Sequence, residues 1–100
     1  MNMQQMMAQA QRMQRELKKA QAELAQKEFV ITKGGAVTVT VLGSKEVKSV
    51  QIDKDAFDLD NKEMVEDLIA LAINEAIQKI EAENEAINER ITGQAGGFGF

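Results

Sequence analysis

The chain has 100 residues with a net charge of −4, and it contains no cysteine, histidine, proline, tyrosine or tryptophan. Its length corresponds to about one domain, and without cysteine or histidine it lacks disulfides, thiolate metal sites and the commonest catalytic base. Residues 1–27 carry five basic and two acidic residues, whereas residues 53–100 carry four basic and twelve acidic ones, so we expect an anionic partner to meet the start of the chain.

Residues 2–26 predict one long helix, because they lack glycine and proline and are rich in strong helix formers. Their apolar residues recur every seven positions: Met3, Ala10, Leu17 and Leu24, and also Met6, Met13 and Ala20. This spacing gives a narrow seam, as in coiled coils. A helix of about 25 residues is roughly 37 Å long and is marginal by itself, so the seam requires a partner helix.

Four basic residues of this helix fall away from the seam: Arg12, Arg15, Lys18 and Lys19. Such a cluster is either an ordinary solvated face or a stripe that binds anions, and the pattern leaves both interpretations open.

Residues 28–53 predict a three-stranded antiparallel meander, with strands at about 28–33, 36–42 and 47–53. The middle strand is the clearest, because valine and threonine alternate through it with a period of two.

Two turns are expected to join these strands. Gly34-Gly35 reads as a hairpin turn and not as a phosphate loop, because no lysine–serine/threonine pair closes it and no helix follows it. The second turn is Gly43–Glu46, where glycine allows a positive φ and serine bonds its own backbone.

Residues 53–58 predict a polar connection in which Phe57 anchors onto the core. The acidic residues resemble a calcium loop in composition only, because Asp58 and Met64 occupy the positions of the required glycine and glutamate. We therefore expect neither a metal nor a cofactor.

A second long helix is predicted from an Asp60 N-cap to about Ile91. Its first half has a broad apolar face suited to a sheet, and its second half narrows to a seam: Ile73, Ile77, Ile80, Asn84, Ile87 and Ile91. The simplest fold pairs the two seams in an antiparallel coiled arm that projects from the sheet. Asn84 either fixes the register of this seam or lies exposed near a fraying end.

A homodimer is expected, because one helix on three strands forms a small core for 100 residues and leaves Leu71 or Val65 facing outward. Two-fold association is the commonest remedy, and we expect the contact to use the sheet region and the start of the last helix.

Residues 1–92 are thus expected to form a single domain, and residues 93–100 a flexible glycine-rich tail. Phe98 and Phe100 in this tail are either interaction residues or without a role. No stretch is apolar enough for a signal peptide or a membrane span, so a cytoplasmic protein is expected.

The order and spacing of several stretches resemble the YbaB/EbfC family of bacterial nucleoid-associated proteins. The resemblance covers about residues 3–92 and is carried by these segments: Met6-Met7 with Ala10–Met13, Gly35–Val41 with Gly43, Glu46–Asp53, Glu66–Ile69 and Ala72–Ala76.

The resemblance implies an α+β chain of α-β-β-β-α order that dimerises through its central part and grips duplex DNA with its helical arms. Family members coat or bridge DNA at the nucleoid, and some affect transcription. The family's DNA contacts are attributed to both terminal helices, and the matching basic positions are Arg12, Arg15, Lys18, Lys19 and Arg90.

Two functions are therefore considered. The first is binding of double-stranded DNA through its phosphates, since the lack of tyrosine and tryptophan disfavours base stacking on a single strand. The alternative is a protein-interaction or assembly module without DNA, which would use the adaptable Met3, Met6 and Met7. We expect neither an enzyme nor a small-molecule substrate, because the carboxylates are scattered over helix exteriors.

Overall fold

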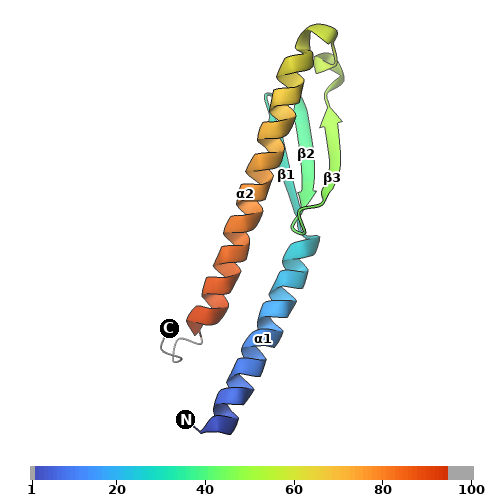
Figure 1. The fold of residues 1–100 in the computed structure, drawn as a ribbon. Coiled ribbons are helices and arrows are strands. Elements are labelled where there is room, and N and C mark those ends of the chain that lie inside the picture. The colour runs from blue at the N-terminus through green and yellow to red at the C-terminus, as the bar shows by residue number, and fades with distance from the viewer. Residues whose placement is uncertain (1, 95–100) are drawn as a thin grey trace.

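The computed structural model describes residues 2–94 and confirms the α-β-β-β-α order (Figure 1). Its elements are α1 (Met3–Gln26), β1 (Glu28–Lys33), β2 (Val37–Leu42), β3 (Val47–Ile52) and α2 (Lys62–Gln94), with short 3-10 turns at Lys54–Ala56 and Leu59–Asn61. The molecule is elongated, measuring 69 × 21 × 14 Å.

The three strands form an antiparallel sheet in the order β1-β2-β3. Val37, Val39 and Val41 are almost completely buried, while the threonines between them lie on the opposite, half-exposed face. The first half of α2 packs on the valine face over β1 and β2 and scarcely touches β3. The core therefore lies between α2 and two of the three strands.

The turn between β1 and β2 is the expected hairpin turn. Gly34 and Gly35 have φ values of 60° and 62°, and the Ala36 amide donates to the Lys33 carbonyl at 3.0 Å. Lys33 pairs with Val37, so the loop comprises residues 34–36. Its two consecutive positive φ values are ones that glycine adopts without steric cost.

The turn between β2 and β3 differs from the expectation. The positive φ, 75°, falls on Lys45 and not on Gly43. Glycine at position 43 instead allows the turn to approach α1 closely, because a Cβ there would lie 1.7 Å from the Leu24 carbonyl oxygen at the end of α1.

The projecting arm is confirmed, since α1 and the second half of α2 run side by side in opposite directions (Figure 1). Leu24, Ile80 and Ile91 are buried in the seam. Asn84 occupies a seam position and is half-buried next to Leu24 and Ile80. At the tip, Met3 and Met6 leave the predicted seam and are exposed.

The segment before α2 corrects two expectations. Phe57 does not anchor onto the core: its side chain is 77% exposed, because the 3-10 turn at Lys54–Ala56 directs Ala56 inward in its place. Asp60 does not cap α2, since a 3-10 turn precedes the helix and the Asp58 carboxylate accepts the Asp60 amide at 3.0 Å.

The end of α2 reaches further than expected. The helix includes Gly93 and Gln94, the first two residues of the segment for which the sequence predicts a tail. Phe98 and Phe100 lie outside the described residues.

We predict that Gly43→Ala lowers the free energy of unfolding by more than about 1 kcal/mol, because the new methyl group meets a backbone carbonyl that has no room to move. Urea unfolding followed by circular dichroism measures the change. Gly93→Ala is the matched control: a Cβ there meets no atom within 4 Å, so it should leave stability unchanged or raise it by up to about 1 kcal/mol. Equal midpoints for Gly43→Ala and the wild type would contradict the close packing of Gly43 against Leu24.

Candidate nucleic-acid interface

Four basic residues of α1 form one surface, which we call the basic face: Arg12, Arg15, Lys18 and Lys19. At about 100° per residue they occupy a sector of roughly 120° on the side of α1 away from the seam. All four side chains are exposed. The fold therefore presents them to solvent along the projecting arm.

The ion pairs of the described residues use other lysines. They are Lys27–Glu83, Lys33–Glu75, Lys45–Glu81, Lys48–Glu28 and Lys62–Glu66. Within residues 2–94, neither the basic face nor Arg90 takes part in an ion pair. Five lysines around the sheet and the base of the arm are thus neutralised, whereas Lys54, Lys79 and the cations further out on the arm take part in none of these pairs. Of the cations unpaired in this range, those of the basic face are the ones gathered on one surface.

Arg90 comes close to one edge of the basic face. It lines a shallow groove of about 410 Å³ between α1 and α2 together with Lys19, Glu16 and Glu23. The two glutamates offset the two cations there, so the groove itself attracts an anion only weakly. Arg12, Arg15 and Lys18 are not among its lining residues, and they form the more strongly cationic part of the surface.

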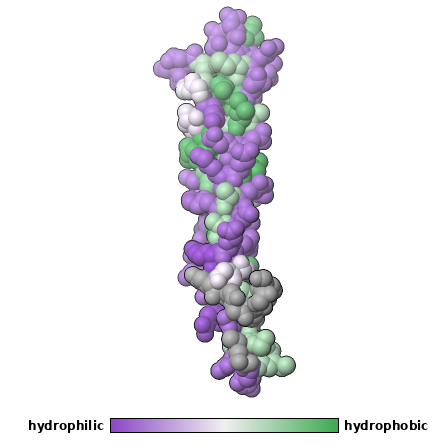
Figure 2. All heavy atoms as spheres, turned by 90° about the vertical axis from the view of Figure 1, so that its left-hand side faces the viewer, coloured by the Kyte–Doolittle hydropathy of each residue, from purple (hydrophilic) through white to green (hydrophobic). Residues whose placement is uncertain are grey.

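The exposed side of α2 has the opposite character. Its exposed acidic residues include Glu66, Asp67, Glu81, Glu85 and Glu89. Viewed from the α2 side, hydrophilic side chains cover most of the surface, and the most hydrophobic ones lie in the upper half (Figure 2). Because the acidic side of α2 repels a polyanion, a polyanion can approach the arm from the basic face.

A second candidate surface lies along β3, and sequence reasoning located it only as part of the sheet region. Val47 and Val50 pair with the buried Val41 and Val39 and share their face of the sheet. Because α2 does not extend over β3, Val50 is nevertheless 43% exposed.

This surface continues into a cavity of about 500 Å³ between β3 and the start of α2, lined mainly by apolar side chains. We call the combined area the β3 apolar surface. Its exposed members are Val47, Val50, Phe57 and Leu59, and the floor of the cavity is formed by the half-buried Ile52 and Ile69 and the buried Val65.

Residues 2–94 lack two other kinds of site. No group of three or more carboxylate side chains between residues 2 and 94 is arranged to hold a metal ion. In the same range, neither long helix is apolar enough over a sufficient length to cross a membrane.

Comparison with known proteins agrees with the resemblance inferred from the sequence. The model of the YbaB/EbfC DNA-binding family matches residues 1–95. A nucleoid-associated protein of Lachnospira eligens is 54% identical over 80 residues, which are 79% of this chain and 69% of the relative. A nucleoid-associated protein of Lachnoclostridium phytofermentans is 48% identical over 99 residues, or 98% and 83% of the two chains.

The crystal structure of an uncharacterized protein from Helicobacter pylori has the same fold, with a TM-score of 0.76 over 92% of this chain and 98% of that one. The two sequences are 20% identical, so this likeness concerns the fold alone.

The ion pair between β1 and α2 should make stability depend on pH. Lys33 Nζ donates to Glu75 Oε1 at 2.8 Å and thereby lowers the pKa of Glu75 below its ordinary value of 4.5. A lowered folded-state pKa stabilises the fold fully above the unfolded pKa, and this contribution is lost as the pH falls through the folded-state value.

We therefore predict that Glu75→Gln reduces the free energy of unfolding at pH 7, and that its difference from the wild type shrinks as the pH falls below 4.5. Urea unfolding at a series of pH values measures both quantities. Glu85→Gln, an exposed and unpaired α2 residue within the described range, should show no such trend. A difference that stays constant down to the lowest pH would refute the assigned pKa direction.

Proposed function

Because the chain belongs to the YbaB/EbfC DNA-binding family, we propose that it is a homodimeric nucleoid-associated protein that binds duplex DNA mainly through phosphate contacts from its arms. One observation carries this proposal: Arg12, Arg15, Lys18 and Lys19 are exposed and make no ion pair within residues 2–94, although five other lysines are paired. The proposed place of action is the bacterial nucleoid, within the cytoplasm.

Phosphate binding follows from the chemistry of this face. Each arginine or lysine that neutralises a phosphate releases a condensed counterion, so the affinity falls with salt by a slope of about −0.9 per contact. Such contacts carry no base information of their own. In this scheme Arg90 adds a contact at the edge of the face, and the acidic side of α2 keeps DNA on the α1 side of the arm.

The β3 apolar surface is the proposed dimer contact. The opposite face of the sheet is more polar: the Thr32 and Thr38 hydroxyls lie 3.0 Å apart and Lys48 pairs with Glu28, with Val30 exposed among them. A contiguous exposed apolar patch on a small domain is a common sign of an interface, and a two-fold axis would use the same patch on both copies. A dimer then carries two basic faces, which allows it to hold a duplex between two arms, to organise the nucleoid and to influence transcription.

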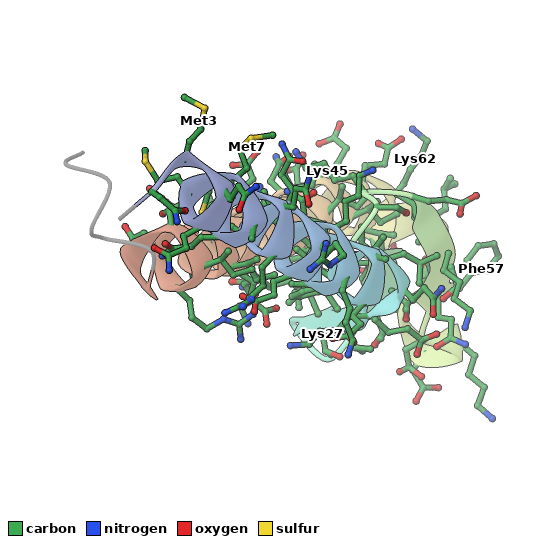
Figure 3. All side chains as sticks on the ribbon, turned by 90° about the horizontal axis from the view of Figure 1, so that it is seen from below. Met3, Met7, Lys27, Lys45, Phe57 and Lys62 are labelled. Carbon is green, nitrogen blue, oxygen red and sulfur yellow. The ribbon has the colours of Figure 1, made fainter. Side chains whose placement is uncertain are left out.

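The alternative, a protein-interaction module without DNA, is supported by the exposed methionines at the arm tip. Met3 and Met7 point to the same side of α1 and leave flexible apolar side chains in solvent (Figure 3). Binding of a protein partner through these methionines should depend little on salt, and this distinguishes the alternative from DNA binding. In neither case is an enzyme proposed, because the family is one of DNA-binding proteins.

For DNA binding we predict that Arg12→Gln combined with Arg15→Gln weakens binding to a mixed-sequence duplex and reduces the salt slope by about 0.9 for each phosphate that the variant no longer neutralises. Fluorescence anisotropy across a salt series gives both values. Lys54→Gln with Lys79→Gln removes the same charge from exposed positions off the arm face and should change the slope little. Equal effects of the two pairs would show that net charge alone governs binding.

For the dimer we predict that Val50→Asp produces a folded monomer, because two facing carboxylates cannot be buried together in an apolar contact. Sedimentation equilibrium at micromolar concentration measures the mass, and circular dichroism verifies the fold. Val30→Asp is the control, since Val30 is 56% exposed on the other face of the sheet and its variant should remain dimeric. A monomeric wild type, or a dimeric Val50→Asp variant, would exclude this interface.

A further inference from the structure

The tip of the arm differs in chemistry from the rest of α1. Residues 2–11 contain no charged side chain, and residues 2–8 are all exposed. In Figure 1 the start of α1 extends past the end of the α2 ribbon, so no described part of α2 covers it. Among residues 2–94, this uncharged start of α1 is therefore covered by no other element.

One face of this tip continues the basic face. At about 100° per residue, Gln4, Ala8 and Gln11 fall in the same sector of α1 as Arg12 and Arg15. All three are exposed. The same side of the helix thus changes from amide and methyl groups to cationic groups between Gln11 and Arg12.

The first turn of the tip is held in helical form by a capping box. The Asn2 side chain accepts the Gln5 amide at 2.7 Å, and the Gln5 side chain accepts the Asn2 amide at 3.3 Å. These bonds occupy Gln5, whereas Gln4 on the neighbouring side is left to solvent. Because the cap keeps the first turn helical, Gln4 and Gln11, seven residues apart, lie on one side of α1.

A free helix of this composition fits the major groove of B-DNA, which is wide enough for one α-helix. A glutamine amide offers one donor and one acceptor and pairs with the N6 and N7 atoms of adenine, and a small methyl group tolerates the thymine methyl. The seven-residue spacing is about 10.5 Å along the helix, or roughly three base-pair steps of 3.4 Å.

We propose that Gln4 and Gln11 read adenines about three base pairs apart in the major groove, while the basic face holds the adjoining phosphates. This inference rests on the proposed binding of duplex DNA. It assigns base recognition to the tip and positioning to the following turns, the usual division between base and phosphate contacts. A second arm tip is the competing occupant, because the exposed Met7 lies on the helix next to both Gln4 and Gln11. The continuity of the two glutamines with the cationic side of α1 favours DNA.

The test compares Gln4→Ala/Gln11→Ala with Gln14→Ala/Gln78→Ala, a control pair of exposed glutamines outside this face. Alanine preserves the helix in both. The probes are an A·T-rich 20-base-pair duplex and the same duplex with 7-deazaadenine, which lacks only the N7 acceptor. Anisotropy titrations at two salt concentrations measure the affinities, and sedimentation measures the mass.

We expect the wild type and the control pair to bind the unmodified duplex about 5-fold or more tightly than the 7-deaza duplex, as one good base contact allows. Gln4→Ala/Gln11→Ala should bind both duplexes equally, with an unchanged salt slope. Equal binding of both duplexes by the wild type overturns base reading and leaves phosphate binding in place, whereas no binding to either duplex overturns both. If the Gln4→Ala/Gln11→Ala variant still prefers the unmodified duplex but sediments as a smaller assembly than the wild type, the glutamine face serves self-association and base reading is overturned.

Discussion

The direction in which the arm projects depends on hydrogen bonds between the β2–β3 turn and the end of α1. The Gly43 amide donates to the Lys27 carbonyl at 2.9 Å, and the Ser44 amide donates to the Ala25 carbonyl at 3.2 Å. The Ser44 bond thereby satisfies one of the carbonyls that a helix end leaves without partners, and the Gly43 bond holds Lys27, the residue that follows α1. Because this end of the sheet is occupied by Leu24 and the turn, α1 cannot fold back over the strands and must continue away from them along α2.

Projection of α1 separates the molecule into two electrostatic regions. Around the sheet, glutamates of α2 lie within reach of lysines from the strands and turns, as in Lys33–Glu75 and Lys45–Glu81. Solvent-accessible pairs of this kind contribute little stability each, but they reduce the positive charge around the sheet. The outer part of α1 faces solvent on its basic side, so its charges stay uncompensated. A chain with a net charge of −4 thus retains a local cationic surface, and local charge rather than net charge governs what approaches that surface.

Much of the fold could be predicted because its signals are local. The heptads of both helices, the valine–threonine alternation of β2 and the glycine pair at 34–35 each specify an element within about ten residues of chain. Their order then leaves little choice of topology, since neighbouring strands joined by short turns pair antiparallel. The identity of the four basic residues on the outer face of α1 follows from the same helical period.

By itself, then, the sequence determined the elements, their order and which side of each is apolar or charged. Tertiary structure alone decided which of those sides are covered. Val50 has the pattern of a core residue and is left open because α2 passes over β1 and β2 only, and Phe57 is turned outward by a 3-10 turn. Arg90 meets Lys19 together with two glutamates in one groove. The periodicity of a sequence predicts the face of the helix or strand on which a side chain lies. The residue that covers this side chain comes from a distant part of the chain, so only the packed fold brings the two together.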